Sequence, residues 1–94
     1  MNWQVSVKKS VLKGIDKLPI DVAMTFWFLA REIETLGPLR CNWKNFGKLR
    51  GHDNHYHCHI KSGRPTFVVC WEVVNKEIRI VEVYYAGTHE NAPY

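Results

Sequence analysis

Cysteines are few in this chain and follow no metal-binding or redox pattern. The three of them, Cys41, Cys58 and Cys70, are odd in number, and none belongs to a CxxC pair. Disulfide-stabilised secreted domains carry even numbers of cysteines, and paired CxxC motifs are typical of zinc sites. We therefore expect reduced thiols that serve as packing residues, in a cytoplasmic protein.

Long apolar runs are also missing. No stretch approaches the length of about 20 residues that a membrane-spanning helix needs, and no secretory leader opens the chain. Repeats, linkers and low-complexity segments are absent too. The chain has 94 residues and 46% of them are hydrophobic, so we expect one folded domain over residues 1–94 that makes no membrane contact.

Acidic residues are almost absent between positions 40 and 64. Asp53 is the only one there, so the stretch carries +5 in a chain of net charge +4, from six basic residues: Arg40, Lys44, Lys48, Arg50, Lys61 and Arg64. The same stretch holds four of the five histidines. Such a patch attracts polyanions, and RNA, DNA or an acidic protein segment are all candidates. A solvated basic face without a partner is the alternative.

The first half of the chain predicts a strand followed by two helices. Alternating apolar residues predict the strand over Trp3–Val7, and the first helix is expected over Lys8–Lys17. The second helix has apolar residues at steps of four and three, which form one face: Val22, Phe26, Leu29, Ile33 and Leu36. We place its N-cap at Asp21 and its end at Gly37–Pro38.

The second half predicts three consecutive strands joined by short turns. Their ranges are His55–Ile60, Thr66–Val74 and Ile78–Ala86, with Gly87 ending the last. Residues 39–54 have no clear period and should form a loop, with a short strand around Lys48–Leu49. The order β-α-α-β-β-β describes an α+β domain, in which two helices pack on one face of an antiparallel sheet.

The first of these three strands has two chemically different sides. Its apolar residues share the side expected to face the helices: Tyr56, Cys58 and Ile60. The alternating residues share the side expected to be open: His55, His57 and His59. Trp71 and Phe67 are assigned to the core. His52 and His55, in or beside the loop, are expected to be solvated surface residues.

The order and spacing of several short motifs resemble the RelE/ParE toxin superfamily. Lys48-Leu49-Arg50-Gly51 precedes Tyr56, which opens the alternating strand, and a hydrophobic-aromatic strand follows over Phe67–Val74. The last strand ends near Gly87, with His89 and Tyr94 beyond it. The resemblance covers nearly the whole chain. It implies a RelE-like fold and a type II toxin–antitoxin toxin. Members of the RelE and HigB type are ribosome-dependent mRNA endonucleases that a partner antitoxin holds inactive.

The resemblance also implies roles for individual residues. His57 and His59 stand where RelE-like strands carry two basic residues, His89 stands where a basic residue follows the glycine, and Tyr94 stands at the terminal aromatic. The sequence departs from the pattern at Val68, where the family usually has an arginine. Arg64, in the preceding turn, is the nearest substitute.

Metal-free RNA cleavage needs a base for the ribose 2′-OH, a cation for the phosphate and an acid for the leaving 5′-oxygen. Histidine suits both proton transfers near neutral pH, and arginine suits the phosphate. We assign His57 or His59 as the base, His89 as the acid and Arg64 as the cation. Tyr94 is expected to stack on a base or to share in proton transfer. Lys48, Arg50 and Lys61 are expected to bind RNA. The expected partners are a cognate antitoxin, the ribosome and mRNA, and no cofactor is expected.

Three alternatives remain open from the sequence. ParE-type relatives share the fold, lack the nuclease residues and inhibit DNA gyrase, and a binding-only relative is also possible. The alternating His55, His57 and His59 could instead hold zinc, although no nearby cysteine or acid completes such a site on the same side of the strand. We therefore assign no metal.

Overall fold

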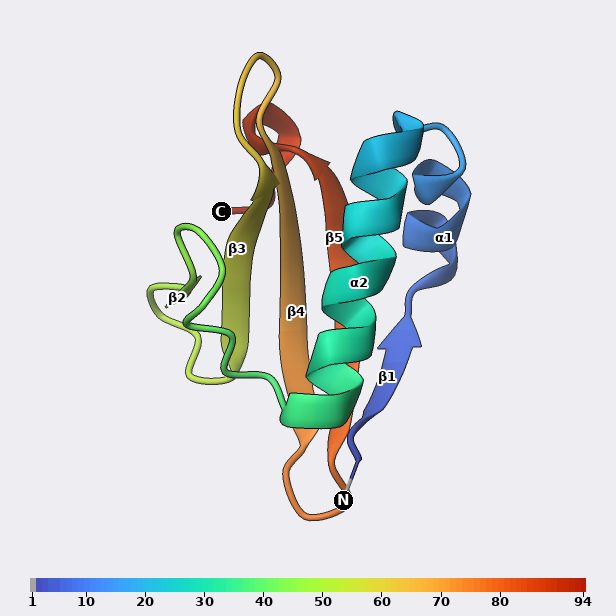
Figure 1. Ribbon diagram of the computed structural model, residues 1–94. Helices are drawn as coiled ribbons and strands as arrows, with labels where there is room; N and C mark the ends of the chain where they lie inside the picture. Colours follow the sequence, from blue (N-terminus) through green and yellow to red (C-terminus); the bar gives the residue numbers. More distant parts are fainter. Residues whose placement is uncertain (1) are drawn as a thin grey trace.

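The computed structural model describes residues 2–94, which form a five-stranded sheet with two helices. The strand order is β1-β5-β4-β3-β2 (Figure 1). The strands are β1 (Gln4–Val7), β2 (Gly47–Lys48), β3 (His55–Lys61), β4 (Phe67–Asn75) and β5 (Ile80–Thr88). The predicted α+β order is confirmed, and β3, β4 and β5 form the expected antiparallel meander. The sheet is mixed rather than purely antiparallel, because β1 pairs in parallel with β5.

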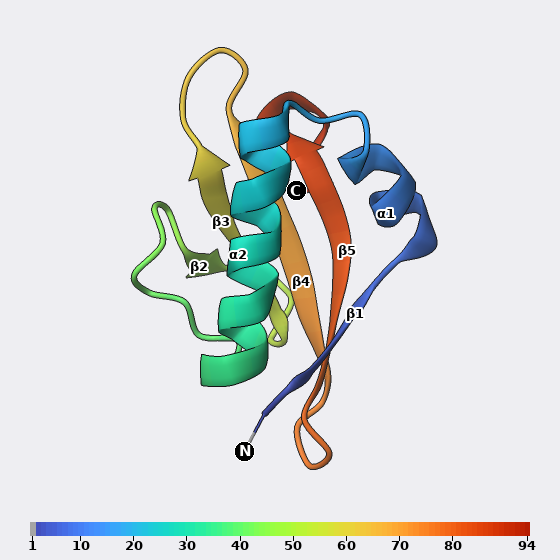
Figure 2. The same cartoon turned by 45° about the vertical axis from the view of Figure 1, so that its right-hand side comes forward.

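Both helices contribute to a single core on one face of the sheet. Helix α2 (Ile20–Leu36) runs along the sheet, and α1 (Lys9–Ile15) packs beside β5 (Figure 2). Four residues of the predicted apolar stripe of α2 are buried: Val22, Phe26, Leu29 and Ile33. Leu36 is not, with 65% of its surface exposed. In residues 2–94, no helix combines the length and the apolar character that crossing a membrane requires.

Two predicted helix boundaries were wrong. The first helix ends at Ile15 rather than Lys17. The second begins at Ile20, with Pro19 as its N-cap residue and no side-chain capping bond. Asp21, the predicted cap, lies in the first turn of α2 and pairs with Lys61 instead, with 2.5 Å between Oδ2 and Nζ. The fixed backbone angle of proline favours this helix start without a polar cap.

The last strand runs later than its periodicity predicted, from Ile80 to Thr88. Asn75 Oδ1 accepts hydrogen bonds from the backbone N–H of Glu77 (2.9 Å) and Ile78 (3.0 Å), so the turn extends past Ile78. At the other end the strand continues through Gly87 rather than stopping there. A Cβ on Gly87 would lie 2.9 Å from the Tyr85 hydroxyl oxygen, which donates a hydrogen bond to Thr88 O at 2.6 Å. Glycine leaves room for this contact.

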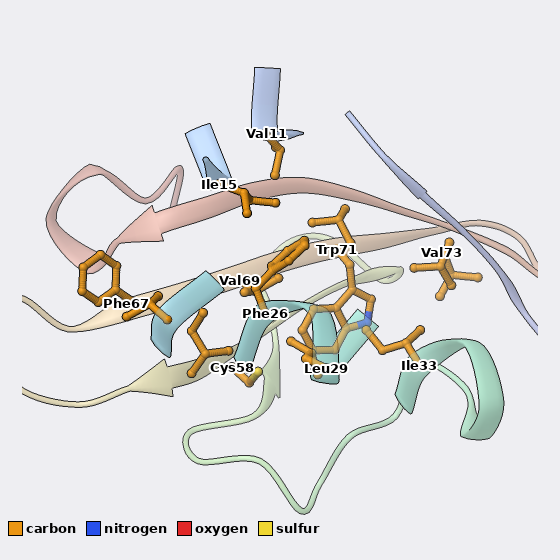
Figure 3. Close-up of a cluster of buried hydrophobic side chains, with 14 residues drawn as sticks. Val11, Ile15, Phe26, Leu29, Ile33, Cys58, Phe67, Val69, Trp71 and Val73 are labelled. Carbon is orange, nitrogen blue, oxygen red and sulfur yellow. The ribbon is translucent and has the colours of Figure 1, made fainter. Parts of the chain in front are cut away.

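The core lies between α2 and the middle of the sheet (Figure 3). Phe26, Leu29 and Ile33 of α2 face Cys58 and Trp71 of the sheet. Cys58 and Ile60 are buried on the helical side as predicted, so His57 and His59, which alternate with them, project from the opposite side. Trp71 and Phe67 are buried in this core, as expected.

Candidate functional site

Four predicted residues meet on the side of the sheet that faces away from the helices. The ring of His57 lies 4.7 Å from that of Tyr94, measured between centroids. The rings of His59 and His89 are 5.6 Å apart, and those of His89 and Tyr94 are 5.9 Å apart. We call these four residues the histidine–tyrosine cluster. This side of the sheet is therefore only partly open, because the end of the chain folds over it.

Backbone hydrogen bonds hold the end of the chain in this place. The N–H of His89 donates to Thr66 O at 2.8 Å, which fixes the start of the 3₁₀ turn η1 (His89–Asn91). Ala92 N–H then donates to His89 O at 3.2 Å. The turn reverses the chain, and its end comes back to β3 (Figure 1). Tyr94 is thus brought to His57 although the two are far apart in sequence.

Burial and neighbouring charges hold the two strand histidines in their neutral form. Burial, followed by the proximity of His59 and His89, lowers the pKa of His57. Burial, His89 and Lys44 lower the pKa of His59. Nδ1 of His57 is buried without a hydrogen-bond partner among the described residues, so protonating it would leave a buried N–H unpaired. At neutral pH both rings are therefore able to accept a proton.

Tyr94 has the opposite shift. Burial raises the pKa of Tyr94, and the neighbouring Cys70, Cys58 and Tyr85 add to this effect. Its hydroxyl is therefore protonated at neutral pH and can donate a hydrogen bond. The cluster thus combines proton acceptors and a proton donor within contact distance of one another.

The low pKa values predict that acid destabilises the protein. On unfolding, His57 and His59 regain a pKa of about 6.5, so the unfolded state binds protons more readily. Their contribution to the free energy of unfolding is therefore fully present above about pH 6.5 and is lost as the pH falls through the lowered folded-state values. Urea unfolding between about pH 8 and pH 5 measures this. The double variant His57→Gln/His59→Gln should lose less stability than the wild type, and equal losses would contradict the prediction.

The predicted RNA-binding lysines and arginines lie on different sides of the cluster. A cleft of about 550 Å³ holds Lys48 and Arg50 together with His57 and Tyr94. A second groove of about 530 Å³ holds Arg64 beside His89. Lys61 is not brought to the cluster, because it pairs with Asp21 on α2.

Lys44 is a basic residue next to the cluster that the sequence did not single out. The backbone oxygen of Lys44 accepts a hydrogen bond from the His59 N–H at 2.8 Å, and its charge contributes to the lowered pKa of His59. Only the net charge of its segment pointed to it, since the loop has no periodicity to reveal which side chains approach the sheet.

A partly buried carboxylate fastens this loop to α2. Glu32 Oε1 accepts hydrogen bonds from Arg40 Nη1 (2.7 Å), Asn42 Nδ2 (2.8 Å) and Trp43 Nε1 (2.9 Å). Burial acts to raise the pKa of Glu32, but hydrogen bonds from these three partners outweigh it and hold the pKa below its usual value. The loop position of Lys44 therefore depends on an ionised Glu32.

Replacing Glu32 by alanine is expected to destabilise the protein by roughly 1.5–3 kcal/mol, since three donors lose a charged acceptor. The matched control is Glu34→Ala on the same helix. Glu34 makes an exposed ion pair with Arg31 at 3.8 Å, which is worth about 0–1 kcal/mol. Urea unfolding compares the two variants, and equal losses would show that the Glu32 network does not hold the loop.

His55 was expected to be solvated, but it is only partly exposed and is held from two sides. Its Nδ1 lies 3.1 Å from the Tyr84 hydroxyl oxygen, and its Nε2 lies 3.5 Å from Glu72 Oε2. Tyr84 reaches this side of the sheet beside Tyr85, because the β4–β5 register shifts between Cys70 and Trp71 and adds a residue to β5. Simple alternation along the strand would not have placed both tyrosines on one side. His52 is exposed, as expected.

The chain is similar to known proteins in its three-dimensional structure. No protein-family model matches the chain, and no curated protein does. The solved structure of an E. coli RelE toxin in the free state, with two arginines changed to alanine, matches with a TM-score of 0.74, 22% identity and coverage of 98% of this chain and 88% of that one. The isolated E. coli RelE toxin matches with a TM-score of 0.71, 20% identity and coverage of 97% and 88%.

An archaeal RelE–RelB complex from Pyrococcus horikoshii OT3 matches over 98% of this chain and 100% of that chain, with a TM-score of 0.70 and 19% identity. The chain has the RelE fold. TM-scores of 0.70–0.74 establish the fold, whereas identities of 19–22% do not carry an activity over to this chain.

Within the RelE fold, Val68 occupies the strand position where the motif resemblance places an arginine. Val68 is fully buried and pairs in register with His59 and with Gly87. The basic side chains near the cluster therefore come from other segments, with Arg64 of the β3–β4 turn in one groove and Lys48 of β2 in the other.

The three alternating histidines of β3 do not point to a common position. Among residues 2–94, no group of three or more histidine, cysteine, aspartate or glutamate side chains is arranged to hold a metal ion. His55 is turned toward Tyr84 and Glu72, whereas His57 and His59 contact the end of the chain.

Proposed function

We propose that this chain is the toxin of a toxin–antitoxin pair and cleaves mRNA on the ribosome without a metal ion. The observation that carries the proposal is the convergence of His57, His59, His89 and Tyr94 between two grooves of a RelE fold. One groove holds Lys48 and Arg50, and the other holds Arg64 together with Glu90. An RNA strand laid across both grooves would bring its backbone over these rings. The similarity to solved RelE toxins supports the same proposal.

The proposed reaction is attack by a ribose 2′-oxygen on the adjacent phosphorus. His57 or His59, neutral at physiological pH, takes the proton of the 2′-OH as the O2′–P bond forms. The P–O5′ bond breaks, and His89 donates the proton that the 5′-oxygen needs. The products are a 2′,3′-cyclic phosphate and a 5′-hydroxyl. Each positioned acid or base typically contributes roughly 10²–10⁴ in rate.

The cation for this reaction would come from Arg64, which shares a groove with His89. Its planar group can donate two hydrogen bonds to phosphate oxygens as they gain charge. Lys48 and Arg50 would hold the strand on the other side of the cluster, beside Tyr94. In this arrangement Arg64, Lys48 and Arg50 bind the phosphates in place of the arginine that Val68 replaces.

Induced expression tests the proposal, with primer extension on a translated reporter mRNA and on the same mRNA with its start codon removed. New cuts inside the translated codons, absent from the untranslated control, are the expected result. Growth arrest without cuts would favour the gyrase-inhibitor alternative, since buried Val68 removes one nuclease cation. If neither growth arrest nor cuts are observed, the chain has a RelE fold without toxin activity.

An antitoxin is the second part of the proposal, supported by the RelE–RelB complex among the structural neighbours. Helix α2 carries an exposed apolar stripe that could receive it: Ile20, Met24, Trp27 and Phe28. These positions follow helical spacing, and exposed patches of this kind on a small protein mark interaction surfaces.

The double variant Met24→Glu/Phe28→Glu is expected to weaken antitoxin binding by more than about tenfold and to leave mRNA cleavage intact, because apolar anchors dominate such interfaces. Co-purification with the product of a short neighbouring reading frame measures the binding. Ile78→Glu is the matched control, since Ile78 is equally exposed but lies in the β4–β5 turn. Undiminished co-purification of the double variant would exclude this face.

A further inference from the structure

The cleft beside the histidine–tyrosine cluster continues into a row of rings that the proposed chemistry does not use. The rings of His52 and His55 lie 4.6 Å apart, and those of His55 and Tyr84 lie 5.3 Å apart. All three residues line the cleft of about 550 Å³ that also holds Lys48, Arg50 and Tyr94. The cleft thus has aromatic walls with two cations among its lining residues.

One hydrogen bond and a nearby carboxylate hold the middle ring of this row, that of His55. Burial raises the pKa of Tyr84, so its hydroxyl stays protonated and can donate to Nδ1 of His55. Nε2 of His55 then carries the ring proton and points toward the Glu72 carboxylate. Only about a quarter of the His55 side chain is exposed (25%). The ring is therefore held in one orientation before any ligand arrives, which reduces the entropy lost on binding.

We propose that this cleft binds the base of one unpaired nucleotide next to the cleaved phosphate. The inference rests on the proposed function. The base would stack among His52, Tyr84 and Tyr94, and its phosphate would contact Lys48 and Arg50. Aromatic and histidine side chains beside basic residues are the usual means of binding single-stranded RNA, because every base has a face that can stack.

The position of the cleft determines which nucleotide of the RNA the bound base belongs to. Tyr94 belongs both to the cleft and to the histidine–tyrosine cluster, and so does His57. A base seated in the cleft therefore belongs to the nucleotide that flanks the reacting ribose. Seating it sets which phosphate lies over the histidines. An acidic peptide would also be attracted by Lys48 and Arg50, but it would make no use of the ring row.

The test is an NMR titration of the purified protein, without ribosomes, using a 2′-O-methyl RNA trinucleotide that cannot be cleaved. The ring resonances of His52, His55 and Tyr84 are expected to shift with the trinucleotide and not with inorganic phosphate. His52→Ala is expected to weaken binding by roughly 5- to 100-fold, and His52→Phe, which keeps a ring, to stay within about threefold of wild type. His52 is exposed, so neither change should disturb folding.

Ile78→Ala, in the β4–β5 turn, is the control and should bind like the wild type. Equal shifts with inorganic phosphate, or equal affinity of the wild type and His52→Ala, would overturn the base-binding cleft. Stronger binding by a poly-glutamate peptide through the same resonances would also overturn it, in favour of a protein ligand. The titration measures binding and not cleavage, so the two proposals can fail separately. If the protein binds the trinucleotide but does not cut mRNA in cells, the nuclease proposal is wrong and the base-binding cleft is retained.

Discussion

Replacing both His57 and His59 by alanine, or His89 alone, is expected to reduce the cleavage of translated mRNA by roughly 10²–10⁴. The reason is geometric as well as chemical. The His59 and His89 rings meet edge to face with 5.6 Å between their centroids. The lowered pKa values of His57 and His59 keep both rings ready to accept a proton. Primer extension, quantified over time after induction, measures the loss.

Single variants then separate the two strand histidines. Replacing the residue that acts as base should reduce cleavage nearly as far as the double variant does, because catalytic groups that act as a unit are not additive. Loss of the base should also remove the fall in cleavage rate at acidic pH, which a merely structural histidine would leave in place.

Lys13→Ala is the control for an alanine substitution away from the cluster, since Lys13 is exposed on α1. Far-UV circular dichroism must show that each variant is folded. If His57→Ala, His59→Ala and His89→Ala all retain full cleavage, the assignment of the histidines is wrong. If Lys13→Ala reduces cleavage as much as they do, the losses are not specific to the histidine–tyrosine cluster.

The helix and strand that have a regular apolar pattern were predictable from the sequence. The steps of four and three from Val22 to Ile33 required one buried face, and the alternation of His57, Cys58 and His59 required two sides of a strand. Both patterns are local consequences of helix and strand geometry. They identified the core and placed two of the cluster histidines correctly.

What the sequence could not predict depends on contacts between distant segments. The parallel pairing of β1 with β5 is one case, and the return of Tyr94 to His57 is another, for which only the motif resemblance gave a signal. Register shifts are a third. The shift between His59 and Lys61 breaks the alternation, and Lys61 reaches Asp21 on α2 instead of the histidine side.

Alanine at Trp71 is expected to have the largest effect on stability, roughly 3–5 kcal/mol. Trp71 is fully buried (0% exposed) in the centre of β4, and its ring stacks near those of Phe46 (6.0 Å) and Tyr56 (6.4 Å). Its Nε1 donates to Pro38 O at 3.1 Å, so its loss leaves both a cavity and an unpaired carbonyl. A domain of this size has about 5–15 kcal/mol in total, so urea unfolding should show a large part of the free energy of unfolding gone.

The control is Trp27→Ala, because 46% of Trp27 is exposed and its loss should amount to about 1 kcal/mol or less. Equal losses would mean that Trp71 does not organise the core.

The replacement of Trp71 should also affect the proposed cleavage. Trp71 adjoins Cys70, which pairs in register with His57, and its indole packs against Phe46 in the loop that carries Lys44 and Lys48. Cleavage by Trp71→Ala should therefore fall by more than the loss of folded protein explains. The reason is that β3 and the loop would lose the packing that holds them beside the end of the chain.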